Sequence, residues 1–369
     1  MGALTAAAEL RAFRAPGRVN LIGEHTDYND GFVLPLAIDL ECVVRARPRG
    51  DGTVHARSID VEGEIELPAD GSAEPAQVRL AWGRFVAAVL RVLAERGRQP
   101  VGADLVISST VPIGAGLSSS AALEVALALA LADAASLELA PLELARACRE
   151  AEQLASGVRG GMMDQLASLT GRRGCALLID CRSLDVTPIP IPRELAVLVV
   201  HSGVSRTLAG SAYDERRAEC ERIARRLGVA ALRDATLEQV RDEPRARHVV
   251  SENARVLAAA PALAAGEGET VGRLLFESHA SLCDDYEVST PELDALVAAF
   301  AESGALGARL TGAGFGGCVV ALARRHEAER VLAEAVERYQ AETGRAPRPY
   351  PIEAADGAGS IATDLEGAT

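Results

Sequence analysis

Residues 112–126, PIGAGLSSSAALEVA, constrain the fold of this chain more than any other stretch. They follow a short β-prone run at residues 104–110 and precede an Ala- and Leu-rich run that continues to Leu131. This order predicts a strand, a glycine turn and a helix. Gly114 and Gly116 permit positive φ angles and a close approach to a ligand, and the serines can cap the helix. Such a turn favours an anion at the helix start, but a turn with a serine cap and no ligand fits the same residues.

Composition limits both the ligand and the mechanism. The sequence contains no lysine, which excludes a G-x-x-x-x-G-K-[ST] phosphate loop, so a nucleotide must be held by backbone, hydroxyl groups, arginine and a metal. The net charge of −14 argues against a nucleic-acid partner. At 369 residues and 49% apolar, the chain suits two globular domains that share a cleft.

The compartment is predicted from what the sequence lacks. The N-terminus has no signal-peptide pattern, and no apolar run is long and pure enough to span a bilayer. Seven scattered cysteines, none in a C-x-x-C pair, indicate reduced core residues. We therefore expect a cytoplasmic protein with no membrane partner, and we take a monomer as the default.

The polar stretch at residues 24–30 lies between two apolar runs, so we expect a loop between strands that is excluded from the core. Carboxylates and an imidazole on one loop match the hydroxyls of a sugar, although the loop taken by itself favours a solvated hairpin tip. Arg18, just before the loop, is either a surface arginine or a cation beside a transferring phosphate.

Short β-like runs at residues 43–67 predict a meander. An amphipathic helix is expected from Trp82 to about Arg96, and Trp82 either packs in the core or stacks on a purine base. Another helix starts at Pro141 and carries Glu152, which either faces water or holds Mg²⁺ through oxygen.

Residues 157–171, GVRGGMMDQLASLTG, place Asp164 in the first turn of a helix. It is either an ordinary helix-start acid or a base that accepts a proton from a substrate hydroxyl. Residues 174–190 predict a β-hairpin, and the prolines after it mark a domain boundary at residue 192.

The second half of the chain predicts an alternation of helices and strands. A strand is expected at residues 195–200 and two β runs joined by four glycines at residues 308–320, where the backbone approaches another segment or a ligand closely. Helices are expected at about 210–227, 245–259, 290–304 and 326–342, and residues 350–354 are a candidate closing strand.

Three motifs in this order resemble the GHMP small-molecule kinases. They are GRVNLIGEHTDYNDG at residues 17–31, PIGAGLSSSA at 112–121 and LTGAGFGGC at 310–318, and the first resembles the galactokinase signature. The resemblance implies an α+β, two-domain fold with the active site in the cleft. Residues 1–192 would form a ribosomal protein S5 domain 2-like domain, and residues 193–369 a ferredoxin-like domain whose last strand is a candidate to return to the first.

The resemblance also implies a function: phosphorylation of α-D-galactose at its anomeric hydroxyl by ATP with Mg²⁺. Asp164 and Arg18 would be catalytic, with Asp164 either accepting the proton or orienting the hydroxyl. The implied sugar-binding residues are Arg18, Glu24, His25, Asp27, Gly161, Asp164 and Tyr213. The implied ATP-binding residues are Gly114, Ala115, Gly116, Leu117, Ser118, Ser119, Ser120 and Trp82. Ser120 and Glu152 match the magnesium ligands, with Ser119 as a second candidate.

The sequence leaves three other functions open. A related kinase could use another acceptor, such as N-acetylgalactosamine, because packing around C2 is not readable from sequence. A sugar and ATP sensor without turnover is a second alternative, which the intact phosphate loop, Arg18 and Asp164 disfavour. A plain nucleotide-binding module is the third, and nothing in a nucleotide requires Glu24, His25 and Asp27 together. Asp30 departs from the Asn-Gly-Gly ending of the signature, and we expect it to be a surface change without chemical effect.

Overall fold

Three β-sheets form the frame of the molecule. The computed structural model describes residues 9–205 and 209–362. The first sheet, in spatial order, consists of β13 (Gly359–Ile361), β1 (Arg11–Asn20), β3 (Pro35–Arg49), β6 (Gly102–Ser109), β4 (Thr53–Ser58) and β5 (Glu64–Pro68). The second consists of β10 (Gly307–Thr311), β11 (Cys318–Arg324), β9 (Leu195–His201) and β12 (Arg348–Tyr350). The third consists of β2 (Phe32–Val33), β7 (Cys175–Asp180) and β8 (Val186–Pro190).

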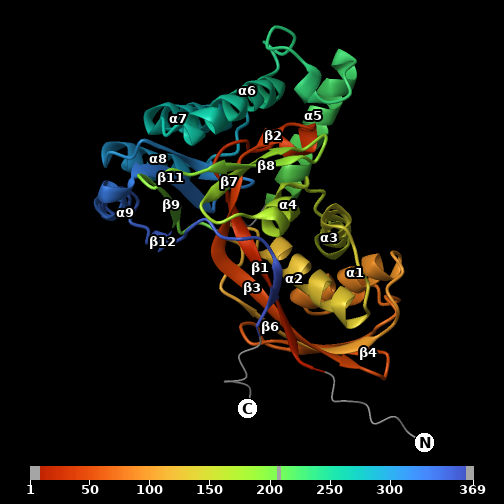
Figure 1. The fold of residues 1–369 in the computed structure, drawn as a ribbon. Helices are drawn as coiled ribbons and strands as arrows, with labels where there is room; N and C mark the ends of the chain where they lie inside the picture. Colours follow the sequence, from red (N-terminus) through yellow and green to blue (C-terminus); the bar gives the residue numbers. More distant parts are fainter. Residues whose placement is uncertain (1–8, 206–208, 363–369) are drawn as a thin grey trace, which may run out of the picture.

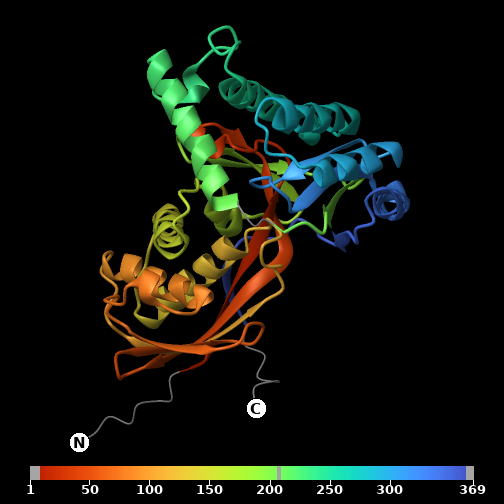
Figure 2. The same ribbon diagram turned by 180° about the vertical axis from the view of Figure 1, so that it is seen from behind.

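Helices cover these sheets, as Figures 1 and 2 show. Their bounds are α1 (Ala81–Ala94), α2 (Ser119–Ala134), α3 (Pro141–Ser156), α4 (Met163–Thr170), α5 (Ala209–Leu227), α6 (Pro244–Ala264), α7 (Gly268–Asp284), α8 (Pro291–Glu302) and α9 (Ala328–Thr343). Short 3₁₀ turns occur at η1 (Asp27–Asn29), η2 (Pro75–Gln77), η3 (Leu232–Asp234) and η4 (Arg325–Glu327). The helices expected in both halves of the chain are therefore present, and α6 extends five residues past the expected end.

The first sheet is not the meander that the sequence predicted. Strand β6 lies between β3 and β4, pairing antiparallel with β3 and parallel with β4. Within residues 43–67, where the meander was expected, β4 and β5 are the consecutive strands that pair as a hairpin. The prediction is wrong because alternating apolar residues show which runs are strands, but the partners of a strand depend on distant segments.

Helices α1, α2 and α3 lie on one side of the first sheet (Figure 1), and α2 packs against β1 and β3. The core between them is aliphatic: Leu127, Leu131, Val89 and Leu90 are fully buried. Their burial anchors α2, so the glycine turn before it has a fixed position at the end of the sheet.

The second sheet is covered by helices α7, α8 and α9, which pack on β10 and β11. Thr290 caps α8 through a bond from the amide of Leu293 to its hydroxyl, 3.3 Å long, as the sequence predicted. The two β runs at residues 308–320 form a hairpin, β10 and β11, as expected. The α+β class predicted from the sequence is confirmed.

The chain returns to the first sheet near its end. Strand β13 pairs antiparallel with β1, and Ala354 makes a single bridge to Ile38. Residues 350–354 therefore do not form the continuous closing strand that was expected. The strand β12 ends at Tyr350, and Ala354 makes an isolated bridge. In the described residues, no helix has the length and apolar character that crossing a membrane requires.

Candidate active site

One cavity of about 270 Å³ gathers residues from all three sequence motifs. Of the predicted site residues, it is lined by Arg18, Glu24, His25, Asp27, Gly114, Gly116, Ser118, Ser119, Ser120, Glu152, Gly161, Asp164 and Tyr213. Gly312 and Ala313 from the third motif close it. Ala115 and Leu117 do not line it, because both are buried in the core beneath the turn.

Arg18 and Asp164 form a bidentate ion pair inside this cavity. The Nε of Arg18 donates to Oδ1 of Asp164 at 2.7 Å, and Nη2 donates to Oδ2 at 2.8 Å. Arg18 projects from β1 where the ladder to β3 is irregular, and Asp164 stands in the first turn of α4. Burial opposes the charge of Arg18, but the negative charges of Asp164 and Glu24 outweigh it and raise its pKa.

Arg18 also ties Asp164 to the glycine turn. Its Nη1 donates to the carbonyl of Gly116 at 2.7 Å, and its amide donates to the carbonyl of Leu117 at 3.1 Å. Ser118 donates from its hydroxyl to Oδ2 of Asp164 at 2.5 Å. The turn and the carboxylate are therefore held at one point by a single buried cation.

The glycine turn has the expected backbone but not the expected cap. Gly114 and Gly116 have φ angles of 76° and 86°. Ser118 precedes α2 with φ 57°, and its side chain makes no cap bond because its hydroxyl is directed to Asp164 instead. The serine-cap reading is wrong for Ser118, and the amides at the start of α2 are left without a side-chain cap.

The polar loop at residues 24–30 is mostly buried, contrary to the prediction that it is excluded from the core. Glu24, His25 and Thr26 are at most 3% exposed. Glu24 accepts from the amide of Gly312 at 2.6 Å and from the hydroxyl of Thr311 at 3.2 Å. The prediction failed because the partners of this loop come from the third motif, almost 300 residues away in the chain.

His25 is held in one orientation by two partners. Its Nδ1 lies 2.8 Å from the hydroxyl of Tyr28 and its Nε2 lies 3.2 Å from the carbonyl of Ala313. A carbonyl only accepts, so Nε2 carries the proton and Nδ1 accepts from Tyr28. Burial lowers the pKa of His25 well below its usual value, so the ring is neutral near pH 7.

Asp27 is a partly buried carboxyl group beside two other acids. Burial, with the negative charges of Asp164 and Glu24, raises its pKa to about 7. Gly161 lies so close that a Cβ at this position would be 2.1 Å from Oδ2 of Asp27. Gly161 therefore has to be glycine for Asp27 to keep its place.

Tyr213 lies over this part of the cavity, on α5. Its ring centroid is 5.6 Å from that of His25 and 5.2 Å from that of Tyr28. Burial raises the pKa of Tyr213 well above its usual value, so its hydroxyl stays protonated and can donate. The tyrosine thus supplies an apolar face with one polar end.

Glu152 and Ser120 face the cavity from α3 and α2. The hydroxyl of Ser120 lies 2.8 Å from Oε1 of Glu152, and Gln165 donates to Oε2 at 3.0 Å. Two oxygen ligands at neighbouring positions around Mg²⁺ are about 2.9 Å apart, from bonds of about 2.0–2.1 Å. Ser120 and Glu152 therefore fit a magnesium site, and Ser119 lines the same wall.

A second, more apolar cavity of about 460 Å³ adjoins the first. Trp82, Phe85 and Ile113 line it, and Ser119 and Ser120 line both cavities. The buried Nε1 of Trp82 has no hydrogen-bond partner among the described residues. An aromatic, apolar pocket next to a serine-rich helix start suits a flat heterocycle with phosphates attached.

Several residues that support the site, without lining the cavity, were not predicted from the sequence. Arg309 is fully buried, and its Nη1 lies 3.5 Å from Oε1 of Glu24 and donates to the carbonyls of Asn20 and Leu21. His248 lies 3.1 Å from the carbonyl of Glu24. Glu252 accepts from the amide of Gly23 at 2.9 Å. The position of Arg309 directly before the third motif could have marked it. The helix α6 was predicted, but nothing in its sequence marked His248 or Glu252 as partners of the site.

Family models match most of the elements that build this site. The GHMP kinases N terminal domain matches residues 84–172, and the GHMP kinases C terminal domain matches residues 259–341. The solved mevalonate kinase of Methanococcus jannaschii is similar in fold, with a TM-score of 0.69 at 20% identity over 95% of this chain and all of that one. Fold and site together define a kinase of the GHMP class.

Relatives with higher sequence identity show which family within the GHMP class the chain belongs to. The galactokinase galactose-binding signature matches residues 5–48. A galactokinase from Roseiflexus sp. (strain RS-1) is 47% identical over 363 residues, which cover 94% of this chain and 92% of the relative. Lactococcus lactis galactokinase, solved in complex with galactose, has a TM-score of 0.90 and 34% identity, with 97% of each chain covered. The chain belongs to the galactokinase family.

Proposed function

We propose that this chain transfers the γ-phosphoryl group of ATP to the anomeric hydroxyl of α-D-galactose, giving galactose 1-phosphate and ADP. The family and the galactose complex of a relative support the substrate. The observation that carries the proposal is the convergence of Asp164, the glycine turn and the polar loop at residues 24–30 on one cavity. Phosphoryl transfer requires positioning and charge stabilisation more than covalent chemistry, and such a cavity supplies both.

Asp164 would receive or direct the proton of the anomeric hydroxyl. Its Oδ2 already accepts from Arg18 and Ser118, whereas among the described residues Oδ1 accepts from Arg18 alone. A carboxylate oxygen can accept two hydrogen bonds, so Oδ1 retains a position for the sugar hydroxyl. As the oxygen bonds to γ-phosphorus and the bond to the β-phosphate oxygen breaks, the proton moves to Asp164 and ADP leaves.

The sugar would be held by groups of both hydrogen-bonding kinds. Glu24 and ionised Asp27 accept, and the hydroxyl of Tyr213 donates. His25 shapes the wall, since both of its ring nitrogens already have partners. A pocket built in this way rejects analogues that lack one hydroxyl, because a buried polar group would lose its partner.

The nucleotide would lie across the two cavities. Its base would occupy the apolar cavity beside Trp82, and its phosphates would approach Gly114, Gly116 and the serines at the start of α2. Ser120 and Glu152 would hold Mg²⁺, with Ser119 as a second candidate. Bound there, the ion would neutralise charge on the β- and γ-phosphates.

Two further assignments remain part of this proposal. Residues 1–192 and 193–369 would be the two domains, although β13 pairs with β1 across that division. The working form would by default be a monomer.

An acceptor panel tests the proposed substrate. ADP release would be measured with galactose, 2-deoxygalactose, talose, glucose and N-acetylgalactosamine at equal concentrations. We expect the highest kcat/KM for galactose. A higher value for N-acetylgalactosamine would assign another acceptor, and calorimetric binding of galactose and ATP without turnover would assign a sensor.

A further inference from the structure

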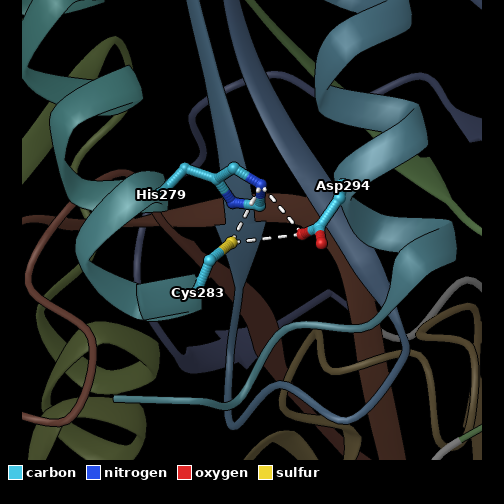
Figure 3. A group of neighbouring side chains, drawn as sticks. All are labelled: His279, Cys283 and Asp294. Carbon is cyan, nitrogen blue, oxygen red and sulfur yellow. Dashed lines mark hydrogen bonds and ion pairs between the residues drawn. The ribbon is translucent and has the colours of Figure 1, made fainter. Parts of the chain in front are cut away.

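A histidine, a cysteine and an aspartate meet outside the cavity, between α7 and α8. His279 and Cys283 are four residues apart on α7 and so face the same side of the helix, and Asp294 lies in the first turn of α8. Figure 3 shows the three groups facing one another. Their ligand atoms all lie within 4.8 Å of one another, and none of the three lines the candidate active site.

The separations match those around a tetrahedral zinc ion. The Sγ of Cys283 lies 3.6 Å from Nε2 of His279 and 3.1 Å from Oδ1 of Asp294, and Nε2 lies 3.3 Å from Oδ1. Bonds of about 2.3 Å to sulfur and about 2.0–2.2 Å to nitrogen and oxygen, at tetrahedral angles, place S and N about 3.5 Å apart, S and O about 3.5 Å, and N and O about 3.3 Å. One ion can therefore reach all three atoms with side-chain movements of a few tenths of an ångström.

We propose that His279, Cys283 and Asp294 form a binding site for a divalent transition metal of the zinc type, with solvent as the fourth ligand. A thiolate sulfur favours zinc or cobalt over magnesium, which prefers oxygen. The site is thus chemically distinct from the pair Ser120 and Glu152. Its ligands come from two helices, which hold them more precisely than loops would.

The alternative is a hydrogen-bonded cluster that needs no ion. In that arrangement Cys283 and Ser289 donate to Oδ1 of Asp294, and His279 donates from Nε2 to the same oxygen. The Nδ1 of His279 accepts from the amide of Leu310 at 3.4 Å. Burial, with the hydrogen bond to Asp294, raises the pKa of the Cys283 thiol to about 12, so the thiol is protonated in this state.

Metal binding has to overcome this network, and the cost is identifiable. The thiol proton is released to solvent, and the imidazole proton moves from Nε2 to Nδ1, which gives up the contact with Leu310. The protonated Nδ1 then faces the buried amide of Leu310, so that amide loses this acceptor and meets a second donor. An unsatisfied buried donor is costly, and the bonds to the metal must exceed this cost. The exposed side of Asp294, whose side chain is 50% accessible, leaves a path for the ion and room for a solvent ligand.

Cobalt titration of the purified full-length chain, stripped of metal with EDTA and desalted, tests the site. We expect one equivalent of Co²⁺ to bind with the visible bands of a tetrahedral complex and a sulfur-to-cobalt charge-transfer band, both displaced by Zn²⁺. Cys283→Ala should abolish the charge-transfer band, and Asp294→Asn should weaken Co²⁺ binding at least tenfold. Cys175→Ala is the matched control, because Cys175 is also a half-buried free thiol, and it should leave the spectrum unchanged.

Two results would overturn the site. The first is a wild-type protein that shows no stoichiometric charge-transfer band at equimolar Co²⁺, a result that does not depend on any variant folding. The second is a band that persists in Cys283→Ala. Magnesium-dependent kinase turnover does not enter either readout, so the site and the proposed function can fail separately.

Discussion

Arg18 holds Asp164 by two parallel hydrogen bonds of 2.7 and 2.8 Å, and the same guanidinium donates a third hydrogen bond to the carbonyl of Gly116. The pair is set deep in the cavity, with the Arg18 side chain 7% and the Asp164 side chain 24% accessible. Breaking one partner of a buried pair leaves the other charge without compensation, at a cost of about 3–5 kcal/mol. The pair is thus a fixed part of the site, with the carboxylate aimed before any sugar enters.

Asp164→Asn should reduce kcat by about 10²- to 10⁴-fold, because the amide can neither accept the proton nor balance Arg18. ATP binding, measured by calorimetry, should change little. Ser118→Ala is the comparison variant: it removes the third donor to Asp164 and leaves the charge, so its kcat should fall much less. Near-normal turnover by Asp164→Asn would remove the base from the mechanism.

Glu24→Gln should raise the KM for galactose by about 10- to 100-fold, because a hydrogen bond to a charged group contributes about 1.5–3 kcal/mol. The same change leaves the buried Arg309 without its nearest carboxylate, so the midpoint of urea unfolding should also fall. Asp30→Gly is the matched control in this loop. Asp30 has φ 57°, which glycine adopts freely, and its exposed contact with Arg182 contributes little. Equal KM values for the two variants would contradict a sugar-binding role for Glu24.

Gly161→Ala should raise the KM for galactose more than it lowers kcat. The new Cβ would lie 2.1 Å from Oδ2 of Asp27, so that carboxyl must move. Gly160→Ala is a neighbouring comparison, since its Cβ would meet only Oε2 of Glu152, at an ordinary 3.5 Å. Steady-state kinetics would give KM for galactose and kcat for both variants. An equal rise of KM in Gly160→Ala and Gly161→Ala would contradict the role assigned to Gly161.

Stability should fall between about pH 4 and pH 7 because of Asp27. An unfolded aspartate has a pKa of about 3.9, whereas Asp27 has a pKa of about 7 in the fold. Between these values the folded protein keeps a proton that the unfolded chain has released, so the free energy of unfolding decreases as the pH rises. Above pH 7 both states are ionised and this contribution is constant.

Urea unfolding of Asp27→Asn at several pH values measures this contribution. Between pH 4 and pH 7, the free energy of unfolding of the wild type should fall with rising pH more steeply than that of the variant. The difference should be at most about 1.4 kcal/mol per pH unit. Asp30→Asn, in the same loop but with its side chain 47% accessible, should keep the wild-type slope. Identical slopes in wild type and Asp27→Asn would show that Asp27 titrates normally.

Ser120→Ala should increase the Mg²⁺ concentration needed for half-maximal turnover more than Ser119→Ala does. Ser120 lies 2.8 Å from Glu152, which places two oxygens beside one ion position. Titration of turnover with Mg²⁺ at saturating ATP compares the two serines directly. If Ser119→Ala raised this Mg²⁺ concentration more than Ser120→Ala does, Ser119 would be the magnesium ligand instead.

Local patterns in the sequence were sufficient for most elements and for most of the residues that line the candidate active site. Strand, glycine turn and helix at residues 104–131 appear as expected, because a β-prone run, positive-φ glycines and an apolar helix are decided within a few residues. Residues of the three motifs meet in one cavity, together with Glu152, Gly161, Asp164 and Tyr213 from other segments. Each motif could be found from sequence because it carries its hydrogen-bonding groups on a short segment.

What required the tertiary structure is which distant groups become partners. Glu24 is buried because an amide 288 positions away completes its hydrogen bonds, and Ser118 turns from capping α2 because Asp164 lies 2.5 Å from its hydroxyl. The place of β6 between β3 and β4 and the burial of Arg309 were likewise invisible. Sequence shows what a group can bond, whereas burial and partner choice arise only when remote segments pack together and exclude water.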